Sequence, residues 1–250
     1  MSEKLFYDYL ILAWFGTAAA VFLILFFIVA PYGRHDRPGW GPKIRSTWGW
    51  VLMEAPSPIL IALLFIIGDN KGPTAWVPAL LWLGHYTYRS FIFPFLRRGG
   101  EKPMPLMIVA SAVFFNLGNA YLNGRGLFTF TDGCLPLSHP LALLGLALMA
   151  TGFAVHVYSD RLLINLRKPG ETGYKIPQGG LYRWVSAPNY LGEIIEWTGW
   201  ALLVWSPAGL TFAVWTFANL APRALANHKW YKEKFPVYPK ERKALIPGVW

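Results

Sequence analysis

The stretch HPLALLGLALMATGFAVHVYSDRLLI (residues 139–164) decides the fold class of this chain. It is long and apolar enough to cross a bilayer, which takes about 20 residues of helix. The same stretch contains His156 and Asp160, whose side chains are costly at membrane depth unless they are paired or neutralised. The stretch therefore predicts a membrane helix that carries functional residues.

The rest of the chain repeats the apolar pattern. Of its 250 residues, 54% are hydrophobic and only 14% are charged, which is too apolar for an ordinary soluble domain. We therefore expect an all-α integral membrane protein built as a bundle of seven transmembrane helices. The other six apolar stretches cover approximately 7–31, 49–68, 75–96, 104–122, 189–205 and 207–226. The first of them exceeds the usual apolar core of a signal peptide, so we expect it to be retained.

The basic residues predict the orientation of the bundle. Lys4, Lys71 and Arg125 are the only ones on one side of the predicted spans, and the rest of the net charge of +10 falls on the other side. By the positive-inside rule, the N-terminus lies outside and the C-terminus in the cytoplasm. The membrane would be the inner membrane in a bacterium or the endoplasmic reticulum in a eukaryote. The charge therefore follows from topology, and we expect no nucleic-acid partner.

The chain has no internal repeat, so residues 1–250 are expected to form a single domain. Its one cysteine, Cys134, has no partner for a disulfide or a thiolate metal site, and we expect no metal. A segment rich in glycine and proline, residues 168–188, is long for a connector. Such segments are typical of lids and ligand-binding loops, although it could also be a plain cytoplasmic connection.

Three polar stripes at helical spacing are expected to converge near the cytoplasmic end of the bundle. Cations suit phosphate, carboxylates and amides suit hydroxyls and a carboxamide, and aromatic rings suit stacking, so the mixture favours an extended nucleotide cofactor. Alternatively, Glu193 and Glu196 could pair with Arg223 or Arg167 and only lock helices together. The stripes consist of His156, Asp160 and Arg167; of Asn189, Glu193, Glu196 and Trp200; and of Arg223, Asn227, Tyr231 and Lys234. We expect Asn189 to cap its helix.

Two further polar residues, Glu54 and Tyr86, lie in the second and third predicted spans. A glutamic acid and a tyrosine can both donate hydrogen bonds, so together they could polarise a carbonyl group. The alternatives are a Glu54 bonded to Arg89 and a Tyr86 that belongs to an interfacial aromatic belt. Asn116, with Asn119 and Asn123 on the same helical face, could line the same cavity or bond between helices.

Two long segments in the second half have particular sequences, SDRLLINLRKPGETGYKIPQGGLYRWVSAPNYLGEIIEWTGWAL (159–202) and the tail from RALANHKWYKEKF (223–235) to YPKERKALIP (238–247). Through these segments the chain shows a dense resemblance, over roughly residues 156–250, to a known family, the membrane steroid 5α-reductases. Upstream it is sparser, in PYGRH (31–35), WVLMEAP (50–56), HYTYRSF (85–91) and LRRGG (96–100). We take it to cover the whole chain, weakly at the first span.

The resemblance implies a seven-helix enzyme that uses NADPH to reduce the 4,5 double bond of a 3-oxo-Δ4-steroid, with the lipid bilayer as its setting and no obligate protein partner. It implies that Glu54 and Tyr86 bind the C3 carbonyl, in a substrate half over 1–136, and that residues 137–250 form the NADPH half. We place Trp50, Arg89 and Asn116 on the substrate side as well. The implied cofactor residues are Asp160, Arg167, Asn189, Glu193, Arg223, Asn227 and Tyr231, followed by Tyr32, Tyr174 and His228.

Three alternatives remain open from the sequence. A related reductase could act on enoyl thioesters or on another sterol or polyprenyl alkene with the same cofactor. APNYLGEIIEW (187–197) also resembles the pattern of small integral methyltransferases that bind S-adenosylmethionine. A transport or scaffold protein without enzymatic activity is the third alternative, but it leaves the clustering of nucleotide-suited residues unexplained.

Overall fold

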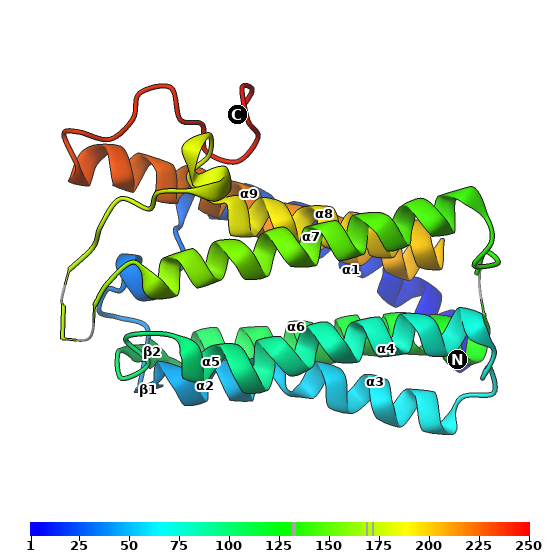
Figure 1. The fold of residues 1–250 in the computed structure, drawn as a ribbon. Helices are drawn as coiled ribbons and strands as arrows, with labels where there is room; N and C mark the ends of the chain where they lie inside the picture. Colours follow the sequence, from blue (N-terminus) through cyan, green and yellow to red (C-terminus); the bar gives the residue numbers. More distant parts are fainter. Residues whose placement is uncertain (132–133, 169, 172) are drawn as a thin grey trace.

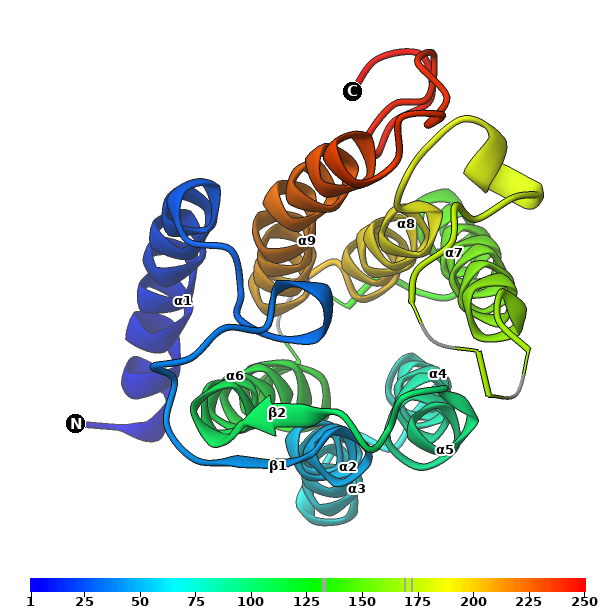
Figure 2. The same ribbon diagram turned by 90° about the vertical axis from the view of Figure 1, so that its left-hand side faces the viewer.

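Helices dominate the computed structural model of this chain, which describes residues 1–131, 134–168, 170–171 and 173–250. They run side by side in two layers (Figure 1), with α7, α8 and α9 in one and α2 to α6 in the other, while α1 packs against α9 and α6 (Figure 2). The helices are α1 (Glu3–Phe27), α2 (Ser46–Glu54), α3 (Pro56–Ile67), α4 (Pro73–Thr87), α5 (Phe93–Leu96), α6 (Leu106–Arg125), α7 (Pro140–Asn165), α8 (Pro188–Val204) and α9 (Pro207–Lys234).

Short elements gather at one end of the bundle. Strands β1 (Lys43–Arg45) and β2 (Pro103–Pro105) pair antiparallel, with Ile44 opposite Met104. Two 3₁₀ turns, η1 (Gly33–His35) and η4 (Gly180–Arg183), lie in the connections before α2 and α8. The segment before α8 and the chain after α9 lie at this same end, opposite the N-terminus (Figure 1). Two π-helical turns, η2 (Tyr88–Ile92) and η3 (Gly126–Phe130), extend α4 and α6.

The length and apolar composition of the helices agree with the predicted integral membrane protein. Within the described residues, four helical stretches are long and apolar enough to span a bilayer: α1, α7, Ser46–Ile67 and Leu106–Phe130. The count of seven spans and the orientation stay predictions. The second predicted helix, 49–68, is instead formed by α2 and α3, which meet at Ala55 because Pro56 has no N–H to donate into the preceding turn.

Glycines bring α7 and α8 into backbone contact. A Cβ atom on Gly152 would lie 2.3 Å from the Glu196 nitrogen, and one on Gly192 would lie 2.5 Å from the His156 nitrogen. Such approaches exclude any larger residue, and small residues at helix crossings are common in membrane proteins. The contact therefore places His156 of α7 and Glu196 of α8 against each other.

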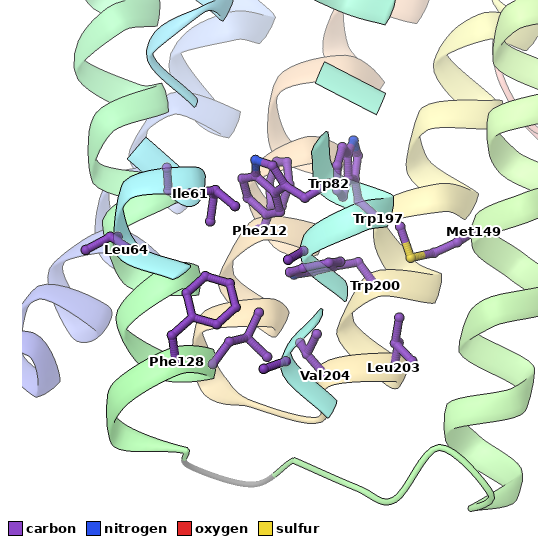
Figure 3. Packing of buried hydrophobic residues seen from close by; sticks show 14 of the residues in the cluster. Ile61, Leu64, Trp82, Phe128, Met149, Trp197, Trp200, Leu203, Val204 and Phe212 are labelled. Atoms are coloured by element: carbon purple, nitrogen blue, oxygen red, sulfur yellow. The ribbon is translucent and has the colours of Figure 1, made fainter. Parts of the chain in front are cut away.

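An aromatic core lies between the two layers (Figure 3). The Trp82 ring is 4.9 Å from that of Trp200, measured between centroids, and the Trp197 ring is 4.1 Å from that of Phe212. The indole nitrogen of Trp200 donates to Asn123 Oδ1 at 2.8 Å. Asn123 therefore bonds between helices, which is one of the two roles predicted for the asparagines of α6. The core joins the layers next to the polar site.

Candidate active site

A buried guanidinium, that of Arg89, lies at the centre of the polar side chains inside the bundle. Its nitrogens lie 4.0 Å from Glu54 Oε1, 3.5 Å from Asp160 Oδ2 and 3.4 Å from Glu193 Oε1. The Trp50 ring covers it, with the ring centroid 4.5 Å from the guanidinium carbon. Because Glu54 comes from α2, Asp160 from α7 and Glu193 from α8, this one cation connects both layers. Its helix takes a π turn at this point, as helices often do at functional sites.

Glu54 and Tyr86, the predicted carbonyl-polarising pair, both contact Asn116. The Asn116 side-chain nitrogen donates to Glu54 Oε2 at 3.3 Å and to the Met53 carbonyl at 2.7 Å. The Tyr86 hydroxyl donates to Asn116 Oδ1 at 3.3 Å. Tyr86 is only 4% exposed and stacks on Trp82, so the alternative of an interfacial aromatic belt is wrong. The asparagine therefore holds two potential donors side by side.

Histidines link the carboxylates of α7 and α8. His156 Nε2 lies 3.1 Å from Asp160 Oδ2 and 3.5 Å from Glu193 Oε1, and its Nδ1 lies 3.8 Å from Glu196 Oε2. Glu196 Oε1 lies 2.7 Å from Nδ1 of His85. No role was predicted for His85, although it precedes Tyr86 directly. His85, His156 and Glu196 place three ligand atoms within 4.8 Å of one another, so these side chains could also hold a metal ion.

One alternative and one prediction from the sequence are wrong in detail. In the described part of the chain, Glu193 contacts Arg89 and His156, and Glu196 contacts the two histidines, whereas Arg223 and Arg167, their partners in the alternative, bond elsewhere. Arg89 is the closer partner because its π turn extends α4, which packs against α8. Asn189 does not cap α8, since the residue before the helix is Ala187 and Asn189 is already inside it. Its amide donates instead to Asp160 Oδ1 at 3.0 Å.

The third stripe, on α9, meets the connection that follows α1. Arg223 donates to the hydroxyls of Tyr32 and Tyr190, the latter at 3.2 Å. Asn227 Oδ1 lies 3.1 Å from His35 Nε2. Burial lowers the pKa of His35, which favours the neutral imidazole at pH 7. This face is therefore rich in hydroxyl and amide groups around one buried cation.

A basic cleft of about 240 Å³ opens beside these groups. Nη1 of Arg34 and Nη1 of Arg97 are buried there without a hydrogen-bond partner among the described residues. Burial and the nearby Arg89 lower the pKa of Arg97 to about 10. The Arg34 guanidinium lies over the Tyr174 and Tyr231 rings. The polar and aromatic lining consists of Arg34, Arg97, Arg98, Asp160, Arg167, Tyr174, Lys175, Tyr231 and Phe93.

The cleft thus brings together four of the predicted cofactor residues, Asp160, Arg167, Tyr174 and Tyr231. The arginines at 34, 97 and 98 were missed as individual site residues, although PYGRH and LRRGG were noted as motifs. Nothing in their local spacing relates them to α7, because the chain brings them there only by folding. The lining does not include His228.

His228 belongs to a separate group that holds the C-terminal tail. Its Nδ1 lies 2.6 Å from Ser186 Oγ, which also lies 2.6 Å from the Tyr238 hydroxyl. The buried Arg242 donates to the Pro177 carbonyl at 3.2 Å. The tail therefore fastens the segment before α8, which carries Tyr174 and Lys175.

Comparison with known proteins shows which family this chain belongs to. A family model described as 3-oxo-5-alpha-steroid 4-dehydrogenase matches residues 102–250. The chain is 40% identical to steroid 5-alpha-reductase DET2 of Gossypium hirsutum over 256 aligned residues, covering 100% of this chain and 99% of the relative. It is 42% identical to 3-oxo-5-alpha-steroid 4-dehydrogenase 1 of Bos taurus, covering 99% and 98%.

The corresponding protein of Arabidopsis thaliana, also named steroid 5-alpha-reductase DET2, is 39% identical and is covered over 99% of its length. The alignments with these relatives cover 99% or more of this chain. The resemblance seen in the sequence is thereby confirmed. The chain belongs to the 3-oxo-5-alpha-steroid 4-dehydrogenase family and is an oxidoreductase.

Proposed function

We propose that this protein reduces the 4,5 double bond of 3-oxo-Δ4-steroids with NADPH, by hydride transfer to C5. The observation that carries the proposal is the position of Arg89, which contacts both Glu54 of the carbonyl-polarising pair and Asp160 of the basic cleft. A substrate carbonyl at Glu54 and a nucleotide in the cleft would therefore meet at one point. The relatives' names supply the substrate class.

The cleft fits NADPH by the chemistry of its donors. Five basic side chains face one carboxylate, and Nη1 of Arg34 and of Arg97 lack hydrogen-bond partners within the described structure. Guanidinium groups suit phosphates, including the 2′-phosphate that separates NADPH from NADH. When bound, the cofactor supplies the hydride. The residues that would hold it are Asp160, Arg167, Asn189, Glu193, Arg223, Asn227 and Tyr231, with Tyr32 and Tyr174; His228 would contribute through the tail.

The protein's part in the chemistry falls to the two donors joined by Asn116. In a conjugated enone, C5 accepts hydride as negative charge moves onto the C3 oxygen. The Tyr86 hydroxyl and a protonated Glu54 would donate hydrogen bonds to that oxygen, so they stabilise the charge as it develops. The Trp50 ring covers Arg89 beside this position. C4 then takes a proton from water.

The apolar helices around the site suit a lipophilic substrate. Long apolar helices surround the site, and a steroid dissolved in the bilayer can enter sideways between them. We assign the protein to the inner membrane in a bacterium or the endoplasmic reticulum in a eukaryote, with the basic end of the bundle in the cytoplasm. Residues 1–136 would then serve the substrate and residues 137–250 the cofactor.

The test is turnover by purified protein in detergent or lipid nanodiscs. We expect NADPH oxidation that depends on a Δ4-3-ketosteroid, with a 5α-reduced product. Turnover of an enoyl thioester in place of the steroid would show a related alkene reductase instead. Binding of S-adenosylmethionine without binding of NADPH would contradict the proposal altogether.

A further inference from the structure

The polar centre of the bundle holds more carboxyl groups than arginines or lysines. Glu54, Asp160 and Glu193 contact Arg89, Glu196 adjoins them through His156, and in the described chain no other arginine or lysine lies within 4.0 Å of these groups. Two histidines at the same centre, His85 and His156, can each add one positive charge. With Glu54 protonated, as the proposed function has it, the formal charge of this anionic cluster is minus two with neutral imidazoles and zero when both are protonated.

Several atoms of the anionic cluster also have no hydrogen-bond partner within the described residues. Glu193 Oε1, Glu196 Oε2 and His156 Nδ1 are buried without one, although Glu193 Oε1 lies 3.4 Å from Arg89 and Glu196 Oε2 lies 3.8 Å from His156 Nδ1. His156 and Glu196 are 0% and 1% exposed, and Glu193 is 9% exposed. Buried carboxylates that make ion pairs but no hydrogen bonds at some of their oxygens are unfavourable, above all in a membrane. The three carboxylates around one arginine, and their oxygens without hydrogen bonds, together favour a cationic guest.

We infer that the anionic cluster binds the oxidised, cationic nicotinamide of NADP⁺ more tightly than the neutral ring of NADPH. The inference rests on the proposed function. Asp160 lines the basic cleft and, like Glu54 and Glu193, contacts Arg89. A nicotinamide that enters from the cleft past Asp160 would therefore lie beside the anionic cluster.

The same charge preference promotes the reaction. Hydride transfer moves two electrons and one hydrogen to C5, C4 takes one proton from water, and the nicotinamide ring is left with one positive charge. Fixed carboxylates beside the ring stabilise that charge as it develops and need no reorganisation. Glu193 and Asp160 thus act on the hydride donor, while Glu54 and Tyr86 act on the acceptor.

The expected size follows from Coulomb's law. At an effective dielectric constant of about 20 and a separation of about 7 Å, one charge changes a binding constant by roughly ten- to fifty-fold. Arg223 and Arg97, which also lie near the centre, reduce the effect without contacting these carboxylates. We therefore expect about tenfold for each carboxylate removed.

The experiment measures the dissociation constants of NADP⁺ and NADPH by calorimetry on purified protein, without substrate. Glu193→Gln keeps the shape and removes one charge, so the ratio of the NADP⁺ constant to the NADPH constant should rise about tenfold. Glu233→Gln is the matched control, because the Glu233 side chain is 65% exposed at the end of α9. Its ratio should stay within twofold of the unmodified protein.

Two further variants guard against a simple packing defect. Glu196→Gln, one turn further along α8, should shift the ratio in the same direction. Arg89→Gln removes the cation and should shift it in the opposite direction, which a loss of structure would not do. Ratios unchanged in both glutamate variants, with both nucleotides bound, would overturn the inference alone. Binding of neither nucleotide by the unmodified protein would overturn the proposed function and the inference with it.

Discussion

At the scale of single residues, the site depends on which polar groups meet. Asn116 joins Glu54 to Tyr86, and Arg89 joins Glu54 to the carboxylates of α7 and α8. Glu54 therefore belongs to the proposed substrate pair and also contacts Arg89, which connects it to the proposed cofactor side. Changing it tests the chemistry without removing the cleft.

Glu54→Gln should cut steroid turnover by about a hundredfold, because an amide is a much weaker acid than a carboxylic acid and stabilises a developing enolate less. The NADPH dissociation constant should stay within about twofold, since Glu54 is not part of the cleft lining. Steady-state kinetics and calorimetry on the same preparation measure both. Glu101→Gln, on an exposed carboxylate paired with Arg45, is the control. Normal turnover by Glu54→Gln would remove the carbonyl-polarising role.

Arg167→Ala should raise the NADPH dissociation constant about tenfold, the typical loss for one charged hydrogen bond. Arg167 lines the cleft and is held there by the Gly173 carbonyl at 3.1 Å. Arg161→Ala is the matched control, because Arg161 is exposed on α7 outside the cleft lining. Equal NADPH affinities of the two variants would exclude Arg167 from the cofactor site.

At the scale of elements, two contacts set the geometry of the site. The glycines of α7 and α8 let the two backbones touch, which fixes His156, Asp160, Glu193 and Glu196 relative to one another. The tail after α9 fastens the segment that precedes α8. We expect the glycine contact between α7 and α8 to affect the stability of the bundle. We expect the contact of the tail with the segment before α8 to affect the geometry of the cleft.

Gly152→Ala should destabilise the protein by about 2 kcal/mol, since its Cβ would lie 2.3 Å from the Glu196 nitrogen and force the helices apart. The measurement is the thermal unfolding midpoint in detergent, which should fall by several degrees. Gly16→Ala in α1 is the control, because a methyl group at that position would meet nothing within 4 Å. Equal midpoints for the two variants would contradict the backbone contact.

Arg242→Gln should weaken NADPH binding more than it slows turnover at saturating NADPH. Arg242 is 2% exposed and donates to the Pro177 carbonyl, while Lys243 exchanges backbone hydrogen bonds with the chain around Trp184 and Ser186. Losing the first bond should loosen the segment that carries Tyr174 and Lys175. Lys240→Gln, on an exposed neighbour, controls for the charge. A lower turnover number with unchanged NADPH affinity would contradict this role of the tail.

At the scale of the whole molecule, the polar face of each single helix could be predicted from the sequence, whereas the contacts between helices could not. Asp160 and Glu193 could be placed on polar faces because helical spacing is local. The central position of Arg89 and the role of His85 depend on how α4 meets α8, which no local pattern records. For the same reason, the alternative partners of Glu193 and the cap predicted at Asn189 are wrong, because Glu193 contacts Arg89 and Asn189 bonds to Asp160 once the helices pack.

The bundle as a whole connects Glu54 and Tyr86, the proposed carbonyl-polarising pair, to the basic cleft through Arg89 and Asp160, and we propose direct hydride transfer there. The decisive measurement uses NADPH carrying deuterium at nicotinamide C4, in each of its two stereochemical forms, with a Δ4-3-ketosteroid and purified protein. Mass spectrometry and NMR then locate the label in the product. We expect one of the two forms to deliver deuterium to C5 of a 5α-reduced steroid. Deuterium absent from C5 with both forms, while NADPH is consumed, would contradict direct transfer.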